Sequence, residues 1–172
     1  MKTKQDGQKR EVKGRLVARG FQEVVSPQSD SPTGLRESSK LFYEVAANEG
    51  FRLWSMDIRA AFLQSNKLDR DVFVEPPADI KKQGIVWKLV KSLYGFKDAS
   101  CKFWLRMKEI LKEQGLCTIK GYEAFYYKSK VDGSLEGIVI THMDNFLLAG
   151  TLEFLDGLEI EVSKLLNVSK VE

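Results

Sequence analysis

The sequence has few of the residues that build disulfide frameworks and zinc sites. It contains two cysteines, Cys101 and Cys117, neither in a Cys-x-x-Cys pair, and one histidine, His142. Reduced thiols are therefore favoured over a disulfide or a zinc site. No apolar run approaches the ~20 residues of a membrane span. The charged N-terminus lacks the apolar stretch of a secretory signal. These absences predict an intracellular protein without a membrane partner.

The 172 residues are enough for one domain or for a piece of a larger one, and 43% of them are hydrophobic. The net charge of +3 is unevenly spread. Residues 1–20 hold seven Lys or Arg against two acids, residues 81–108 hold eight against one, and residues 132–172 hold two against eight acids. This separation fits a nucleic-acid or phosphate partner beside a separate cation site, but for charge runs alone a solvated surface is the better interpretation.

The hydrophobic periodicity and the turn residues predict an α+β layer fold, in which helices and largely antiparallel strands are mixed along the chain. Helices are expected at 35–49, from an Asp98 cap to near Gly115, and after a Thr151 cap. Residues 26–34 read as a loop. Strands are expected at 2–5, 9–18, 51–58, 72–74, 86–90, 125–127, 138–143 and 146–148, with turns at Asp6-Gly7, Asp132-Gly133 and Asp144-Asn145.

Two acids follow runs of apolar strand formers. Asp57 alternates with Met56 and Ile58, so its side chain should point away from the face with the larger side chains. Asp144 is expected at a hairpin tip. If the two strands are neighbours, the two carboxylates converge, and convergent carboxylates are what two Mg²⁺ ions require. By spacing alone this signal is weak, because two acids on strands are usually a cap and a surface residue.

The residues around these acids are more specific. Five segments resemble, in order, motifs of copia-type retrotransposon reverse transcriptases, and the similarity runs from about residue 2 to 170. The segments are KGRLVARGF at 13–21, MDIRAAFLQ at 56–64, VEPP at 74–77, WKLVKSLYGFKDA at 87–99 and HMDN at 142–145.

This resemblance implies a palm-like antiparallel sheet with helices packed on one face and the metal site on the other, plus a partial fingers hairpin. Residues 1–34 would be partial fingers and residues 35–172 mostly palm. The implied reaction is template-directed DNA synthesis, in which a primer 3′-hydroxyl attacks the α-phosphate of a deoxynucleotide. The implied partners are an RNA or DNA template-primer and deoxynucleotides, in a cytoplasmic particle or the nucleus.

The resemblance also implies roles for single residues. Asp57 and Asp144 match the metal-binding aspartates, and Phe62 matches the aromatic gate that rejects a ribose 2′-hydroxyl. The main-chain N–H of Ala61 would lie beside the triphosphate, and Gly95 would pack on the incoming nucleotide and template. Two further groups complete the set: Lys13 and Arg15 as triphosphate-binding cations, and His142 and Met143 near the primer or template.

Two departures limit what the resemblance implies. Asn145 stands where the family has a third carboxylate, so the catalytic set reads Asp57, Asp144 and Asn145. The chain also ends at Glu172, before the family's thumb, connection and RNase H would follow. We therefore expect weakened binding of the family's two Mg²⁺ ions, somewhat better binding of Mn²⁺, and little or no polymerase activity. The alternatives are a non-catalytic nucleic-acid-binding module or a decayed fragment of such an element.

Overall fold

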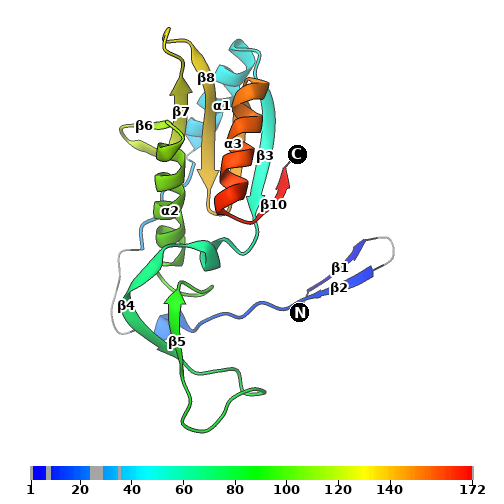
Figure 1. The fold of residues 1–172 in the computed structure, drawn as a ribbon, viewed down its shortest axis with the longest axis vertical. Helices are drawn as coiled ribbons and strands as arrows, with labels where there is room; N and C mark the ends of the chain where they lie inside the picture. The colour runs from blue at the N-terminus through cyan, green and yellow to red at the C-terminus, as the bar shows by residue number, and fades with distance from the viewer. Residues whose placement is uncertain (1, 7–8, 24–28, 35, 172) are drawn as a thin grey trace.

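The computed structural model describes residues 2–6, 9–23, 29–34 and 36–171. Its largest unit is a six-stranded sheet in which every neighbouring pair is antiparallel, with strand order β10-β3-β9-β8-β7-β6 (Figure 1). An α+β fold is therefore confirmed. The six strands are β3 (Arg52–Ile58), β6 (Cys117–Ile119), β7 (Tyr122–Ser129), β8 (Leu135–His142), β9 (Asn145–Gly150) and β10 (Val168–Val171).

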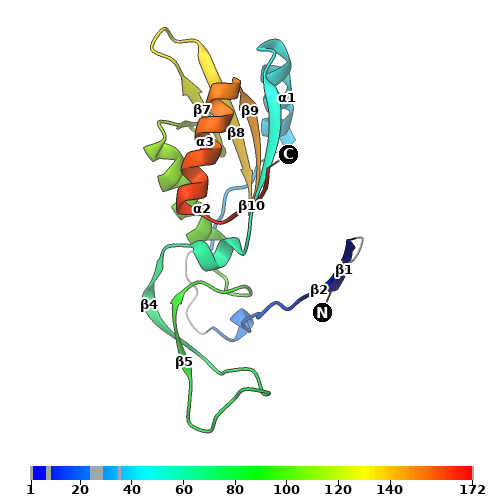
Figure 2. The same cartoon turned by 45° about the vertical axis from the view of Figure 1, so that its right-hand side comes forward.

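Helices cover both faces of this sheet. α2 (Ala99–Glu113) and α3 (Leu152–Leu165) pack on one face, and α1 (Arg36–Asn48) packs on the other (Figures 1 and 2). Neighbouring residues of β7 make the division plain, because Tyr126 contributes to the α2 and α3 core while Phe125 contributes to the α1 core. The expectation that the helices pack on one face is thus wrong. The reason is that β7, β8 and β9 carry apolar side chains on both faces.

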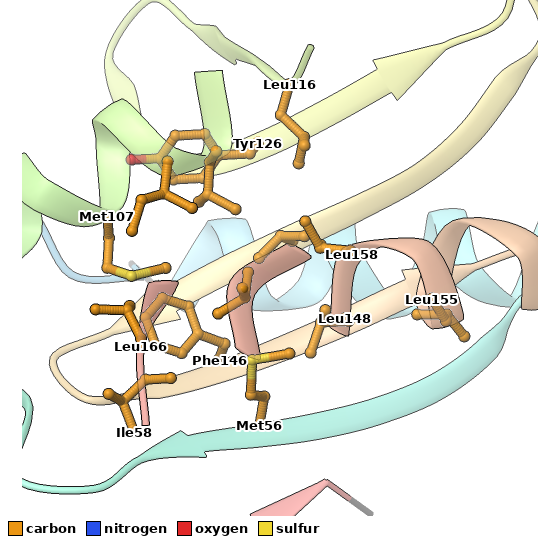
Figure 3. Packing of buried hydrophobic residues seen from close by; sticks show 14 of the residues in the cluster. Met56, Ile58, Met107, Leu116, Tyr126, Phe146, Leu148, Leu155, Leu158 and Leu166 are labelled. Carbon is orange, nitrogen blue, oxygen red and sulfur yellow. The ribbon is translucent and has the colours of Figure 1, made fainter. Parts of the chain in front are cut away.

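The larger core lies between the sheet and the helix pair α2–α3. Met56 and Ile58 of β3 and Phe146 of β9 point into it from the sheet, and Met107 and Leu158 meet them from the helices (Figure 3). Asp57 lies between Met56 and Ile58 in β3, so alternation directs its side chain to the opposite face. This confirms the expectation that the Asp57 side chain points away from the face that carries Met56 and Ile58.

A two-stranded ribbon extends from the lower end of the sheet (Figure 1). It pairs β4 (Lys67–Val74) with β5 (Trp87–Lys91), and both strands lie close to the expected positions, although β4 is longer than expected. The face of the ribbon that carries Val72 packs on Leu93 and Phe96 in a third small core. This core joins the ribbon to the start of α2.

The N-terminal segment forms a hairpin of β1 (Lys2–Asp6) and β2 (Lys9–Lys13). Gly7 of the predicted turn and residues 26–28 of the predicted loop lie outside the described ranges, whereas residues 29–34 form neither helix nor strand, as expected. The second strand was expected to continue to residue 18, but it ends at Lys13, because β1 supplies only five residues for it to pair with. The chain then runs through a short 3₁₀ helix, η1 (Gly20–Gln22).

The two predicted helix caps differ in outcome. Thr151 caps α3 as expected, since its Oγ1 accepts a hydrogen bond from Phe154 N at 3.3 Å. Asp98 does occupy the position before α2, but its side chain makes no capping hydrogen bond. It pairs with an arginine instead, as described below. None of the helices within the described residues is long and apolar enough to cross a membrane.

Candidate functional site

Asp57 and the 142–145 segment meet at one end of the sheet. The register of β3 and β9 places Asp57 directly opposite Asn145, and Ile58 N donates a hydrogen bond to Asp144 O at 3.0 Å. Residues directly opposite one another in an antiparallel pair carry their side chains on the same face. The structure therefore brings Asp57, Asp144 and Asn145 together at one end of the sheet.

The turn at this edge differs from the prediction by one residue. His142 pairs with Asn145, so the two turn residues are Met143 and Asp144, and Asn145 already belongs to β9. Met143 has a left-handed backbone with φ of 54°. Among residues other than glycine, Asn and Asp adopt such a backbone most readily, so the sequence alone favours Asp144-Asn145 over Met143-Asp144 as the turn. The pairing of β8 with β9 fixes the turn one residue earlier, at the cost of strain in Met143.

Asp144 and Asn145 contact each other directly, because Asn145 Nδ2 donates a hydrogen bond to Asp144 Oδ1 at 3.1 Å. Asp57 and Asp144 are half-buried, whereas His142, Met143 and Asn145 are exposed. A carboxylate at position 145 could not donate this bond. The amide therefore engages one of the oxygens that a cation would use.

The oxygen atoms of Asp57, Asp144 and Asn145 can be compared with the ligands that a divalent cation requires. Two carboxylates and one amide are hard oxygen donors of the kind that Mg²⁺ and Mn²⁺ accept. Within the described ranges, however, no group of three or more His, Cys, Asp and Glu side chains could hold a metal ion. The three residues thus offer hard oxygen donors, but with two carboxylates they carry less negative charge than three carboxylates would.

Past Asp57 the chain enters a second short 3₁₀ helix, η2 (Ala61–Gln64). Ala60 precedes it with a left-handed φ of 52°, and Ala61 is fully buried. Phe62 is half-buried, and its ring lies 4.9 Å from that of Tyr94 and 6.5 Å from that of Phe103. Phe62 thus joins the core on one side and keeps part of its surface exposed.

The guanidinium of Arg15 lies over the ring of Tyr94, 4.5 Å from the centre of that ring. Such a contact holds a cation beside an aromatic face. Tyr94 therefore contacts both Arg15 of the N-terminal segment and Phe62 of η2, whose ring is tilted by 54° to its own. Lys13 is the last residue of β2, and its side chain lies outside the described part of the structure.

Gly95 lies where two backbone segments touch. Ala18 N donates a hydrogen bond to Tyr94 O at 2.7 Å, and a Cβ atom on Gly95 would lie 2.1 Å from Ala18 O. Gly95 also has a left-handed φ of 94°. Both facts require glycine here. A Cβ atom on Gly20 would likewise lie 2.0 Å from Gly95 O, so the 18–20 segment rests directly on the 94–96 segment.

Two features near the site were missed by the sequence analysis. The first is an ion-pair network: Arg70 binds Asp98 at 2.7 Å and also pairs with Glu23. Asp98 is fully buried, and its second carboxylate oxygen has no hydrogen-bond partner. The network holds the segment after η1 against the start of α2. No sequence signal links Arg70 to Asp98, because these residues lie 28 positions apart on different elements.

The second missed feature is β10. It pairs with β3 on the side away from β9, with Lys170 opposite Asp57 in register. Asp57 therefore lies on an interior strand of the sheet, between β9 and β10. Four residues with one apolar pair, at 168–171, carry too little periodicity to be predicted as a strand.

Comparisons of the sequence with known proteins identify the family. A sequence model of the reverse transcriptase (RNA-dependent DNA polymerase) family matches residues 1–171. A retrovirus-related Pol polyprotein from transposon TNT 1-94 of Nicotiana tabacum is 27% identical over 157 residues, which is 87% of this chain and 12% of that protein. The Pol polyprotein from transposon RE1 of Arabidopsis thaliana is 28% identical over 150 residues, or 84% of this chain and 10% of that protein.

The chain therefore belongs to the reverse transcriptase family, and within it to the copia-type retrotransposon enzymes. The putative transposon Ty5-1 protein of Saccharomyces cerevisiae is 29% identical over 64% of this chain and 36% of that protein. The chain thus spans about a third or less of the length of these relatives. No solved structure matches it.

Proposed function

We propose that residues 1–172 form the nucleotide- and metal-binding part of a copia-type reverse transcriptase, and that Asn145 impairs it. The observation that carries the proposal is the register that brings Asp57, Asp144 and Asn145 to one sheet edge. In this proposal residues 1–34 belong to the fingers and residues 35–172 mostly to the palm. The parental reaction is the attack of a primer 3′-hydroxyl on the α-phosphate of a deoxynucleotide.

In the proposed site, Asp57 and Asp144 hold the divalent cation. When bound, such an ion neutralises phosphate charge and lowers the pKa of an attacking hydroxyl. Asn145 contributes no charge, and its amide is already bonded to Asp144. Mn²⁺ should bind better than Mg²⁺, because it forms stronger complexes with mixed and neutral ligands.

Phe62 and Arg15 form the proposed nucleotide-facing side. A half-buried ring that packs on Tyr94 is held firmly enough to exclude a 2′-hydroxyl by its bulk. Arg15 is exposed and stacked, so its N–H donors are oriented for phosphate oxygens. Lys13, the backbone of Ala61 and Gly95 complete this side by resemblance. His142 and Met143, exposed at the turn, would face the primer or template.

A second candidate is a non-catalytic module that binds nucleic acid. The hydrogen bond from Asn145 to Asp144 favours it, because it gives the edge a stable arrangement without a metal ion. The basic segments at 1–20 and 81–108 supply sequence-independent affinity for phosphates in either case, and such affinity falls steeply with salt.

Titration with metal ions separates the two candidates. Asn145→Asp adds one carboxylate at the site, whereas Asn48→Asp adds the same charge at the exposed end of α1. If the edge is an impaired metal site, Asn145→Asp tightens Mn²⁺ and Mg²⁺ binding by roughly tenfold or more, and Asn48→Asp leaves it unchanged. Calorimetry measures both. Equal affinities in the unmodified chain and Asn145→Asp would contradict the claim that Asn145 impairs the site. Robust primer extension by the unmodified chain would contradict it as well.

A further inference from the structure

A shallow cavity of about 270 Å³ lies on the side of the sheet covered by α2 and α3. It is lined by residues 64–67 together with Lys91, Arg106 and Leu165. These residues come from four places: the end of η2, the β4–β5 ribbon, the middle of α2 and the end of α3. The cavity volume is large enough for a phosphate group with its hydration, and no acid lines it.

The cavity concentrates positive charge in an unusual way. Lys67 and Lys91 are direct partners in the antiparallel β4–β5 pair, and like charges at such a position repel each other. Arg106, which is 28% exposed, adds a third cation from α2. Because Lys67 and Lys91 are exposed, solvent screens part of this repulsion, and an anion bound between the cations would relieve it further.

The neighbouring cations are arranged differently. Lys88 on β5 pairs with Asp71 at 2.7 Å, and Lys102 on α2 pairs with Asp69 at 2.8 Å. Within the described ranges, Lys67 and Lys91 have no acidic partner within ion-pair distance. The other two cations of the ribbon, Lys88 and Arg70, thus have acidic partners, Asp71 for the first and Asp98 and Glu23 for the second.

One acid does approach the cavity. Glu109 accepts a hydrogen bond from Asn66 Nδ2 at 2.9 Å and lies 3.7 Å from Arg106. It therefore offsets part of the charge of Arg106, and it also fixes the Asn66 side chain at the rim. It does not reach the two lysines. The cavity keeps a net positive charge with Glu109 included.

The cavity is separate from the proposed metal edge. Met56 and Ile58 point into the core beneath α2 and α3, which is the side of the cavity, whereas Asp57 points to the other face of the sheet. A ligand in the cavity would thus not contact the carboxylates.

We propose that Lys67, Lys91 and Arg106 form a binding site for a phosphate group, separate from the carboxylates of the proposed metal site. Because Lys91 and Arg106 belong to the basic segment 81–108, this inference deepens the phosphate affinity of the proposed function and rests on it. Arg106 supplies the fork of N–H donors that suits phosphate oxygens, and the two lysines supply point charges. The phosphate belongs either to a free phosphate or nucleotide or to a nucleic-acid backbone, and both present the same oxygens.

The test is a titration of the full ¹⁵N-labelled chain with inorganic phosphate, balanced with chloride to constant ionic strength. We expect saturable shifts at the backbone amides of residues 64–67, 91 and 106. Lys91→Gln and Arg106→Gln should each weaken binding by about tenfold. Lys88→Gln removes the same charge from β5 outside the cavity and should weaken binding less than about twofold. Lys91→Arg keeps the charge and should keep binding.

Thermal unfolding gives a second measurement that does not depend on reading the shifts. At ten times its Kd, phosphate should raise the Tm of the unmodified chain by about 3–6 °C, and it should raise that of Lys91→Gln much less. The absence of saturable shifts would overturn the proposal. So would equal weakening by Lys88→Gln and Lys91→Gln.

A short single-stranded oligonucleotide, added in place of inorganic phosphate, identifies the source. If it shifts the same amides and competes with phosphate, the site receives a nucleic-acid backbone. If only inorganic phosphate and mononucleotides shift them, the ligand is a free phosphate. Either result, combined with the effects of Lys91→Gln and Arg106→Gln, supports a phosphate site at this cavity.

Discussion

Ile58 N donates a hydrogen bond to Asp144 O at 3.0 Å, and this bond joins the end of β3 to the turn between β8 and β9. It brings the backbones that carry Asp57 and Asp144 together. The alignment of the two acids therefore depends on the sheet and on the turn. Substitutions in the turn should therefore alter the relative positions of Asp57 and Asp144 even when no ligand is bound.

The first prediction concerns the left-handed residue of this turn. Met143 has φ of 54° and is 52% exposed, so replacing it removes strain and little packing. We expect Met143→Gly to be more stable than Met143→Ala by about 0.5–1 kcal/mol, because only glycine adopts this backbone at no steric cost. Urea unfolding of both variants measures the difference. Equal stability would mean that the turn relaxes when the side chain is shortened.

The sequence was sufficient for the elements whose signals are local. The alternation around Asp57, the Thr151 cap and the hairpin of β7 and β8 each depend on residues a few positions apart, and each is confirmed. The order of the motifs likewise indicated the family, which the comparisons then showed. In these places the local preference and the tertiary structure agree.

The misses share a different cause, which is that a distant partner decides the outcome. Asp98 has the identity of a helix cap, yet Arg70 draws its carboxylate away from the helix. Met143 takes the strained turn position because the pairing of β8 with β9 requires it. β6 and β10 have three and four residues, and their neighbours in the sheet make them strands. None of these effects is visible in a single window of sequence.

The second prediction concerns a pair of glycines beneath α3. Gly137 and Gly150 lie opposite each other in register, and the Phe154 ring rests on them. A Cβ atom on Gly137 would lie 2.2 Å from Phe154 Cδ1, so Gly137→Ala should destabilise the fold by about 1–3 kcal/mol. Gly157→Ala is the matched control. It lies within α3 with open space around it, and it should stabilise by up to about 1 kcal/mol.

Thermal or urea unfolding measures both substitutions. In a Phe154→Leu background, Gly137→Ala should cost clearly less, because the ring that it meets is gone. An undiminished cost in that background would show that Phe154 is not the cause of the clash.

The third prediction concerns alkaline pH. Burial raises the pKa of Tyr126 to about 12 from the ordinary value of 10.0, and the nearby Trp104 indole offsets a small part of this. The Tyr126 hydroxyl and Trp104 Nε1 nevertheless lack hydrogen-bond geometry to any partner. Because the pKa is raised in the folded state, the neutral phenol is favoured there. The stability that it contributes is present below pH 10 and is lost as the pH rises from about 10 to about 12.

The loss should approach 1.4 kcal/mol per pH unit across that interval, or roughly 2–3 kcal/mol in all. Tyr126→Phe should remove this part of the pH dependence and should not lower stability at neutral pH, since the hydroxyl has no partner there. Tyr43→Phe, at an exposed tyrosine of α1, serves as the control and should leave the alkaline loss unchanged. Identical curves for the unmodified chain and Tyr126→Phe would refute the assignment.

The last prediction concerns Phe62 and the sugar of the nucleotide. Its ring contacts the tilted ring of Tyr94, which in turn lies under Arg15, so its position is fixed from one side while part of it stays exposed. If this exposed part contacts the sugar, Phe62→Val leaves room for a 2′-hydroxyl. The affinity for ribonucleotides should then rise relative to the affinity for deoxyribonucleotides. A gain of about tenfold or more in the ratio of affinities would correspond to relief of one steric conflict.

The measurement is a competition between matched ribo- and deoxyribonucleotides in Mn²⁺, performed in the Asn145→Asp background, where metal binding is expected to be tighter. Tyr94→Phe keeps the stacked ring and should leave the ratio unchanged. If Phe62→Val also leaves it unchanged while the protein remains folded, Phe62 serves only the core that it shares with Phe103, and the nucleotide lies elsewhere.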